Sequence, residues 1–302
     1  MSFKVANAPV SWGIYEFKDI EPKFPFTRVL DEIAEIGYRG TELGPYGYFP
    51  TDADEQRQEL EKRNLQLVSA FVPVKLVDRN AHQAGVDEAL KVGKLLTALG
   101  AEYIILADDN GTVPELIANA GQRTGSILSA DEWDVYAQGV NMVARRVHDE
   151  TGLGIVFHHH CGGYVETPEE VRQLMSRTDP DLVGLCLDTG HWHYAGGDAV
   201  ACLNEYGERM RHLHLKDCHP EIAKTCREQQ KNYFEAVKSG VFCLLGKGEV
   251  DFPAVLEILE KQGYKGWSTV EQDVLVDDLN APREYAIHNA AYLKRINLWA
   301  DE

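Results

Sequence analysis

The sequence has no run of basic residues and no long apolar run, and each absence excludes a class of protein. Its 302 residues include 30 Lys and Arg against 48 Asp and Glu, a formal net charge of -18 that repels nucleic acids and anionic membrane surfaces. No apolar stretch approaches the roughly 20 residues of a membrane span, and the first residues lack the features of a signal peptide. We therefore expect a cytoplasmic protein that binds neither nucleic acid nor membranes.

Cysteine pairs, linker segments and a dinucleotide motif are also missing. The six cysteines are scattered without a C-x-x-C pair, which argues against a zinc ribbon or a thioredoxin-like motif. No Gly/Ser-rich, Pro-rich or repetitive stretch divides the chain, so residues 1–302 are expected to form one domain. No G-x-G-x-x-G motif follows the first predicted strand, and we expect no nucleotide cofactor.

Short apolar or β-branched runs alternate with helical patterns along the chain. Strands are predicted at residues 4–12, 39–44, 65–74, 102–107, 152–159, 182–188, 210–217 and 266–272. Helices are predicted at residues 26–37, 51–64, 81–99, 129–150, 167–177, 198–207, 224–238, 253–262 and 281–296. Eight strand–helix units imply parallel strands with right-handed crossovers. This alternation predicts an α/β fold, a single closed (β/α)8 TIM barrel rather than an open doubly wound sheet.

Sites in such barrels lie at the carboxyl ends of the strands, and four late strands of this chain end in metal-binding side chains. The candidates are His158, His159, His160 and the loop residue Glu166 after the fifth strand, Asp188 after the sixth, His212 and His214 on the seventh, and Glu271 after the eighth. A converging set of carboxylates and histidines suits Mn²⁺, Co²⁺, Fe²⁺ or Mg²⁺ with open positions for substrate oxygens.

Side-chain alternation refines this set. Cys186 and Asp188 share one face of their strand, and His212, His214 and Lys216 share one face of the next. His191 is expected to orient the Asp188 carboxylate or to bind substrate. Taken singly, each of these residues equally suits a helix cap or an ordinary strand histidine, and the coincidence of four strand ends favours the functional interpretation.

The fifth strand leaves its ligand open. Glu166 precedes a helix start at Thr167 and equally suits a carboxylate facing the helix dipole, and His158 is the alternative ligand. His159 is expected to be structural.

Other residues near strand ends are candidates for substrate binding. Polar side chains that could bind hydroxyls are Asn7, Glu42, His160 and Asp217. Aromatic side chains that could form an apolar wall against a sugar-like ring are Trp12, Tyr46, Tyr48 and Trp192, with core packing as the alternative for each.

Three segments carry a family resemblance. "CLDTGHWHYAGGD", "RMRHLHLKD" and "GWSTVEQD" resemble the signature strands of the xylose isomerase-like barrel superfamily of sugar isomerases, epimerases and dehydratases. Within it, "NAPVSWG" and the segment 216–252 most resemble the myo-inosose-2 dehydratases of inositol catabolism. The resemblance covers nearly the whole chain and implies a homo-oligomer acting on a small polyol or keto-sugar.

The resemblance also implies a cofactor, a divalent metal, with Mn²⁺ or Co²⁺ as the expected ion. Its ligands would be a strand-five acid, Asp188, His214 and Glu271. Many relatives place a glutamate at the fifth strand end, where this chain has His158, and our prediction is that Glu166 reaches back from the loop.

The implied reaction converts scyllo-inosose, 2-keto-myo-inositol, into a trihydroxycyclohexanedione by α-proton abstraction and loss of a β-hydroxyl. The expected catalytic residues are Glu271 or Glu166 as base, and His191, His160 or Lys216 as donor to the leaving oxygen. A metal-dependent ketose isomerase or epimerase is the nearest alternative, because it uses the same enolate. An apurinic endonuclease would need more ligands and a basic surface, and a non-catalytic sugar-binding barrel would bind without turnover.

Overall fold

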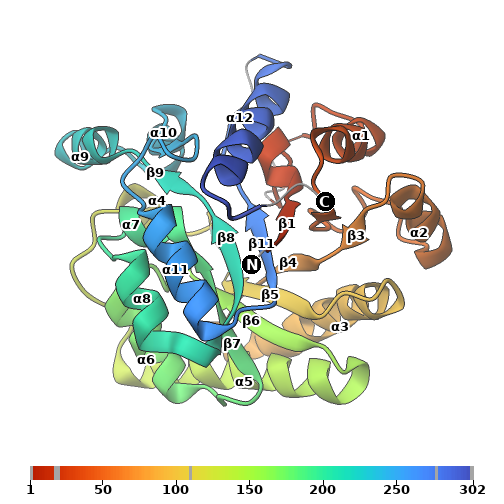
Figure 1. Cartoon of the computed structure of the whole chain (residues 1–302). Helices are drawn as coiled ribbons and strands as arrows, with labels where there is room; N and C mark the ends of the chain where they lie inside the picture. The colour runs from red at the N-terminus through yellow and green to blue at the C-terminus, as the bar shows by residue number, and fades with distance from the viewer. Residues whose placement is uncertain (1–2, 17–20, 109–110, 276–277, 300–302) are drawn as a thin grey trace.

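The computed structural model describes residues 3–16, 21–108, 111–275 and 278–299. A ring of parallel strands lies at the centre of the molecule (Figure 1). Its strands are β1 (Lys4–Asn7), β2 (Gly40–Thr41), β3 (Gln66–Leu67), β4 (Ser69–Val74), β5 (Tyr103–Asp108), β6 (Gly154–His158), β7 (Val183–Asp188), β8 (Met210–Leu215) and β11 (Trp267–Val270). The spatial order is β3-β2-β1-β11-β8-β7-β6-β5-β4.

The ring is closed by one interrupted strand. β3 pairs with β2, whereas β4 pairs with β5, and only Val68 separates β3 from β4 along the chain. The Val68 N–H donates to the Thr41 carbonyl at 2.9 Å, and the Leu43 N–H donates to the Ser69 carbonyl at 3.0 Å. The predicted strand 65–74 therefore spans the seam, and the (β/α)8 barrel expected from the alternation is confirmed.

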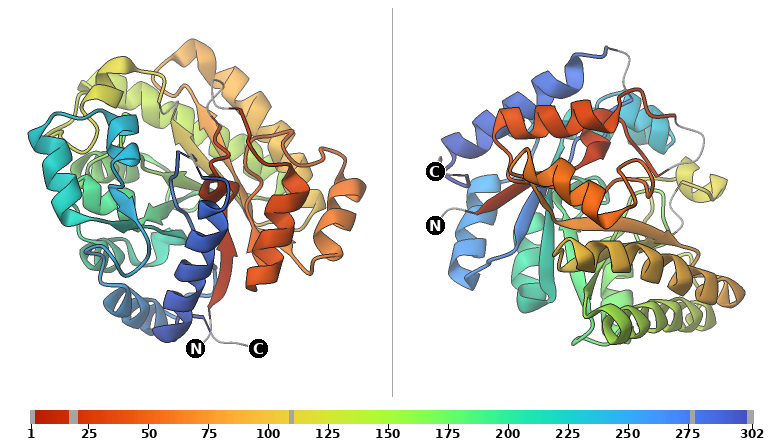
Figure 2. Two further views of the ribbon diagram at one scale, coloured as in Figure 1. Left: turned by 90° about the horizontal axis from the view of Figure 1, so that it is seen from above. Right: turned by 90° about the vertical axis from the view of Figure 1, so that its right-hand side faces the viewer.

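Helices surround the ring (Figures 1 and 2). The outer helices are α1 (Phe26–Ile36), α2 (Ala53–Glu61), α3 (His82–Ala98), α5 (Ala130–Thr151), α6 (Pro168–Arg177), α8 (Ala199–Tyr206), α11 (Phe252–Gln262) and α12 (Ala281–Arg295). The start of α6 is the predicted one, because Thr167 and Glu170 form a reciprocal capping box with Pro168 in the first turn. Helix α1 ends where Gly37 adopts φ 110°, a left-handed conformation that a side chain would strain.

Short elements depart from the predicted pattern at the carboxyl ends of the strands. The chain leaves β1 at Asn7 and turns through the 3-10 helix η1 (Pro9–Trp12), since Pro9 has no N–H to continue a ladder. The predicted helix 224–238 is broken into α9 (Pro220–Glu228) and α10 (Tyr233–Lys238). Helices α4 (Pro114–Ala118) and α7 (Thr189–Tyr194) were not predicted.

A small antiparallel pair, β9 (Asp217–Cys218) and β10 (Phe242–Cys243), extends from the seventh barrel strand. Figure 1 shows β9 beside α9 and α10 on one side of the barrel. Buried apolar residues of α9, α10 and β10 form their own cluster with Tyr194 and Cys161. This small second core holds the added elements over the strand ends.

The main core fills the layer between the ring and the outer helices. Inside the ring, Ile105, Val156 and Cys186 pack together below the strand ends. Within the described ranges, no helix combines the length and the apolar character needed to cross a membrane.

Candidate active site

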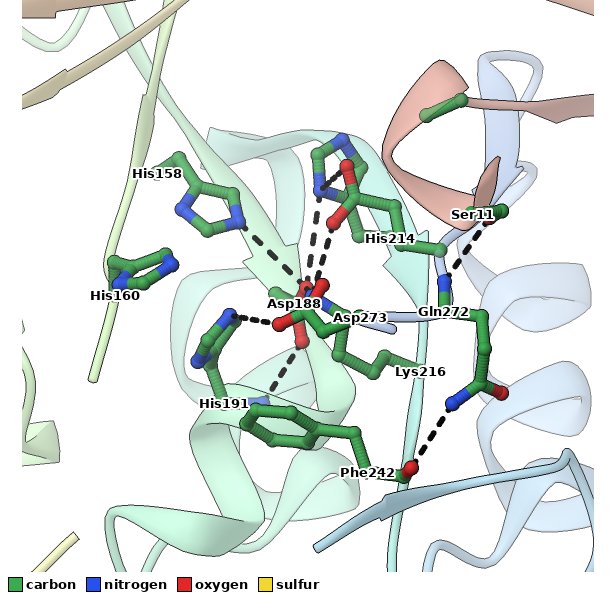
Figure 3. Close-up of polar contacts among 12 residues, drawn as sticks. Ser11, His158, His160, Asp188, His191, His214, Lys216, Phe242, Gln272 and Asp273 are labelled. Carbon is green, nitrogen blue, oxygen red and sulfur yellow. Dashed lines mark hydrogen bonds and ion pairs between the residues drawn. The ribbon is translucent and has the colours of Figure 1, made fainter. Parts of the chain in front are cut away.

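Four side chains from neighbouring strands converge at the carboxyl end of the barrel. His158, Asp188, His214 and Glu271 each place a potential ligand atom within 4.8 Å of the others. The His214 Nδ1 atom lies 3.3 Å from Glu271 Oε1 and 3.8 Å from Asp188 Oδ2, and His158 Nε2 lies 3.6 Å from Asp188 Oδ2. Figure 3 shows His158, Asp188 and His214 pointing toward one another.

The unsatisfied atoms of this group fit a divalent cation. The first three side chains are buried, and neither His158 Nε2 nor His214 Nδ1 has a hydrogen-bond partner in the part of the chain described. Buried polar atoms of a native site are normally paired, so unpaired nitrogens facing carboxylate oxygens require a partner. Two imidazoles and two carboxylates are a donor set for a borderline divalent metal.

Glu42 fixes the orientation of the His214 ring. Its Oε1 atom accepts from His214 Nε2 at 3.1 Å and from His212 Nε2 at 3.0 Å. Burial opposes ionisation of Glu42, but these two histidines outweigh it and hold its pKa well below the usual value. In the neutral form that a metal ligand requires, Nε2–H directed at Glu42 leaves the lone pair of His214 on Nδ1, toward the convergent group. Glu42, expected to bind substrate, lines the cavity and orients a ligand-type histidine.

Lys216 is a buried cation among three carboxylates. Its Nζ atom lies 3.0 Å from Asp188, 3.0 Å from Glu271 and 2.9 Å from Asp273. Burial disfavours its charge, but the three carboxylates outweigh burial and raise its pKa well above the usual value. Lys216 therefore remains an ammonium group and acts as a donor, not as a base.

Replacing Lys216 by methionine is expected to lower the free energy of unfolding by about 3–5 kcal/mol at pH 7, because three buried carboxylates lose their shared counter-charge. Without the ammonium these carboxylates take up protons more readily, so the deficit shrinks as the pH falls toward about 5. Urea denaturation of both proteins at the two pH values measures this. A deficit that grows at the lower pH would contradict it.

The backbone N–H and C=O of one residue, Cys161, fix the tautomers of two adjacent histidines. His160 Nδ1 lies 2.7 Å from the Cys161 carbonyl, so Nδ1 carries the proton and Nε2 carries the lone pair. The Cys161 N–H donates to His191 Nδ1 at 3.3 Å, so the proton of His191 is on Nε2. The two ring centroids are 4.1 Å apart and both rings line the cavity. One histidine thus presents an acceptor and the other a donor.

Burial favours the neutral forms of both rings. Burial, with the charges of His158 and Lys216, lowers the pKa of His160 to about 3. Burial, again with Lys216, lowers the pKa of His191 well below its usual value. The tautomer assignment therefore applies at neutral pH.

Asp273 and Tyr233 belong to the site but were not predicted. Asp273 accepts from the Tyr233 hydroxyl at 2.9 Å and lies 3.6 Å from His191 Nε2, and the hydroxyl is 3.3 Å from His160 Nε2. Alternation after Glu271 is the sequence signal for Asp273, because residues two apart share a face. Tyr233 comes from α10, and no local pattern links that helix to the strand ends.

Gln272 anchors the segment that carries Glu271 and Asp273. Its N–H donates to the Ser11 hydroxyl at 3.1 Å, and its side-chain amide donates to the Phe242 carbonyl at 2.9 Å (Figure 3). These bonds connect the last strand to η1 and to β10, so they hold the two carboxylates over the barrel mouth.

Glu166 does not join the convergent group, which corrects our choice for the fifth strand. Its two carboxylate oxygens accept from the Gly121 and Gly162 N–H groups, both at 2.8 Å, and Arg123 lies 3.8 Å away. Both oxygens are therefore engaged in tying two loops together. His158, which we named as the alternative, occupies the position in its place.

Three expected substrate-binding residues are engaged elsewhere. Asp217 accepts from the backbone N–H groups of Cys218, Gly246, Gly248 and Val250 and organises the loop after β10. Trp12 is fully buried, and its indole N–H donates to Glu32 at 2.7 Å. Asn7 is buried, and its Oδ1 accepts from the Ala8 N–H. Among the described residues that line the cavity, none of these three is present.

A cavity of about 980 Å³ opens over the convergent group. Its polar lining includes His158, His160, His191, Lys216, Glu271 and Asp273. A concave site with convergent polar groups and shifted pKa values is typical of an enzyme active site. The fold and this site define the class of protein, a TIM-barrel enzyme whose chemistry is at the carboxyl ends of the strands.

The chain belongs to the xylose isomerase-like TIM barrel family, an enzyme family whose sequence pattern matches residues 30–296. The resemblance noted in the signature strands is thereby confirmed.

Named relatives refine this placement. An inosose dehydratase of Clostridium botulinum (strain Alaska E43 / Type E3) is 32% identical over 291 residues, covering 96% of this chain and 96% of that protein. The rhizopine catabolism protein MocC of Rhizobium meliloti is 35% identical over 273 residues, covering 90% of this chain and 82% of that protein. The structure of AsbF from Bacillus anthracis, a probable 3-DHS dehydratase, aligns with TM-score 0.67 at 14% identity over 97% of this chain and 99% of that chain. That likeness shows the fold.

Proposed function

We propose that this protein is a metal-dependent hydro-lyase that dehydrates a keto-inositol, scyllo-inosose, to a trihydroxycyclohexanedione. The observation that carries the proposal is the pair His160 and His191, which present an acceptor and a donor side by side next to the convergent carboxylate and histidine group. Elimination of water needs both functions, one to take a proton and one to give it to the leaving oxygen. Curated relatives named inosose dehydratase support the substrate class.

The cofactor in this proposal is Mn²⁺ or Co²⁺, held by His158, Asp188, His214 and Glu271. When bound, such a cation supplies Lewis-acid polarisation of the ketone, which makes the α-proton more acidic and stabilises the enolate charge. Lys216, as a fixed ammonium group, adds positive charge on the same side of the cavity.

The proton steps fall to the two histidines. His160 Nε2 takes the proton from the carbon α to the ketone, and the electron pair of that C–H bond forms the enolate. The β C–O bond then breaks, and the departing oxygen, which accepts a hydrogen bond from His191 Nε2–H, takes up the proton that His160 removed and leaves as water, so that both rings end neutral. Glu271, expected as a possible base, is paired with Lys216 and His214 and serves as a ligand.

Product analysis distinguishes dehydration from isomerisation, epimerisation and binding without turnover. The protein is stripped with a chelator, supplied separately with Mn²⁺, Co²⁺, Mg²⁺ or Zn²⁺, and incubated with scyllo-inosose in D₂O. We expect an unsaturated or diketone product to form only when a metal is supplied. Absorbance and NMR measure its formation. Deuterium incorporation into a panel of ketoses without loss of water would instead assign an isomerase or epimerase. Binding without turnover in every metal would assign a sugar-binding barrel.

A further inference from the structure

The cavity is larger than a single keto-polyol ring requires. Its volume of about 980 Å³ is near the upper end of the range of pockets that take drug-sized ligands, roughly 300–1,000 Å³. A six-membered ring bearing hydroxyl groups is much smaller than such a ligand. A ring placed against the two histidines therefore leaves a substantial part of the cavity unfilled.

The two sides of the cavity differ in chemistry, and the difference follows the order of the strands. β6, β7, β8 and β11 are neighbours in the barrel and carry the histidines, carboxylates and Lys216. β1, β2 and β4 meet on the opposite side through the β3 seam, and most of the residues that these strands and the segments after them contribute to the cavity lining are apolar. With α3, they form what we call the apolar side, lined by Val10, Pro45, Tyr46, Phe71, Pro73 and Val92.

The carboxylates near the apolar side do not make it a charged surface. Glu42 is engaged by two histidines, as described above, and Glu88 is exposed at the rim, where it pairs with Lys91 at 3.1 Å. Burial, foremost among several causes, raises the pKa of the Glu16 carboxyl to about 8, so this group is largely uncharged at neutral pH. Lys91 also lies 4.0 Å above the Tyr46 ring and holds that ring at the cavity edge.

We propose that the substrate of this site is a keto-polyol ring that carries an oxygen-linked apolar group, an alkyl or aryl ether, and that this group binds on the apolar side. The inference rests on the proposed function, because the histidines and carboxylates place the ring. The two sides adjoin directly, since the Phe71 and His158 ring centroids are 5.7 Å apart. A substituent next to a ring bound at His158 thus contacts Phe71, and its removal from water strengthens binding.

Three compounds test the inference on the metal-loaded enzyme: scyllo-inosose, its O-benzyl ether and its O-glucosyl derivative. We expect kcat/KM for the benzyl ether to exceed that for scyllo-inosose at least tenfold, with tighter binding by calorimetry. Preference for scyllo-inosose or for the glucosyl derivative overturns the inference. If no compound is dehydrated but the benzyl ether binds most tightly, the apolar subsite stands and the proposed function fails.

A matched pair of variants on α3 locates the effect. Glu88→Trp places a large ring at the rim of the apolar side, and Ala84→Trp adds the same ring one turn earlier, at an exposed position outside the cavity lining. Glu88→Trp is expected to reduce the benzyl-to-unsubstituted ratio of kcat/KM at least tenfold, whereas Ala84→Trp keeps the wild-type ratio. Equal ratios in the two variants would place the benzyl group elsewhere and refute the subsite.

Discussion

Replacing Asp188 by asparagine is expected to abolish divalent-cation binding and to lower kcat/KM with scyllo-inosose about 10³-fold, since Lewis-acid stabilisation contributes several kcal/mol to such a reaction. Asp188 faces His158 and His214 and forms an ion pair with Lys216, so its negative charge lies at the centre of the convergent group. Its Oδ1 atom also accepts from the His191 N–H at 2.8 Å. Asparagine retains that acceptor, so the start of α7 should survive.

Metal content by mass spectrometry and calorimetric titration with Mn²⁺ measure the effect, and circular dichroism checks the fold. Glu166→Gln is the matched control, because both Glu166 oxygens are bonded to backbone N–H groups. It is expected to destabilise the protein by about 1–3 kcal/mol while Mn²⁺ affinity is retained. Loss of Mn²⁺ binding in Glu166→Gln, with binding intact in Asp188→Asn, would restore Glu166 as the ligand.

The barrel and most of the strand-end groups were predictable because they follow local rules. Side chains two apart share a face, so Asp188 lies above Cys186 and His214 above His212, with β7 and β8 in a register that pairs Asp188 with His214. Parallel strands bring their carboxyl ends to the same edge of the sheet. Alternation and strand-end position therefore indicated Asp188, His214 and Glu271, and the family resemblance selected these three as ligands.

The role of Glu166 depended on contacts that no local pattern contains. Gly121, 45 residues earlier in the chain, supplies one of the two N–H groups that engage its carboxylate. His158, by contrast, is the last residue of β6 and lies two positions after Val156, which packs inside the barrel. Strict use of alternation would have favoured His158.

The sequence could not predict the position of Tyr233 or the tautomers of His160 and His191, because both depend on non-local contacts. Tyr233 approaches Asp273 because the predicted helix 224–238 breaks, where Gln230 adopts φ 51°, and α10 folds back over the site. The opposite tautomers of His160 and His191 follow from the orientation of the two peptide units that flank Cys161. The residue types indicated that histidines take part in the chemistry. Which ring nitrogen carries the proton follows only from the three-dimensional contacts of each ring.

His160→Gln is expected to remove exchange of the α-proton of scyllo-inosose with D₂O and to lower kcat about 10²–10⁴-fold, the usual contribution of a positioned acid or base. The reason is that the Nδ1 contact with Cys161 leaves the lone pair of His160 on Nε2, which makes this atom the acceptor. His191→Gln is expected to lower dehydration to a similar degree but to leave α-proton exchange in place, because His191 presents only a donor.

The two variants thus separate proton abstraction from loss of the hydroxyl. NMR follows deuterium entry and product formation in the same sample, and equal Mn²⁺ content in both variants excludes an effect on the ligands. Both histidines lie in the cavity with ring centroids 4.1 Å apart, so a purely steric change should affect both steps alike in either variant. Exchange that persists in His160→Gln and is lost in His191→Gln would reverse the assigned roles. Loss of exchange in both would mean that the pair acts as one unit, with the proton relayed between the two rings.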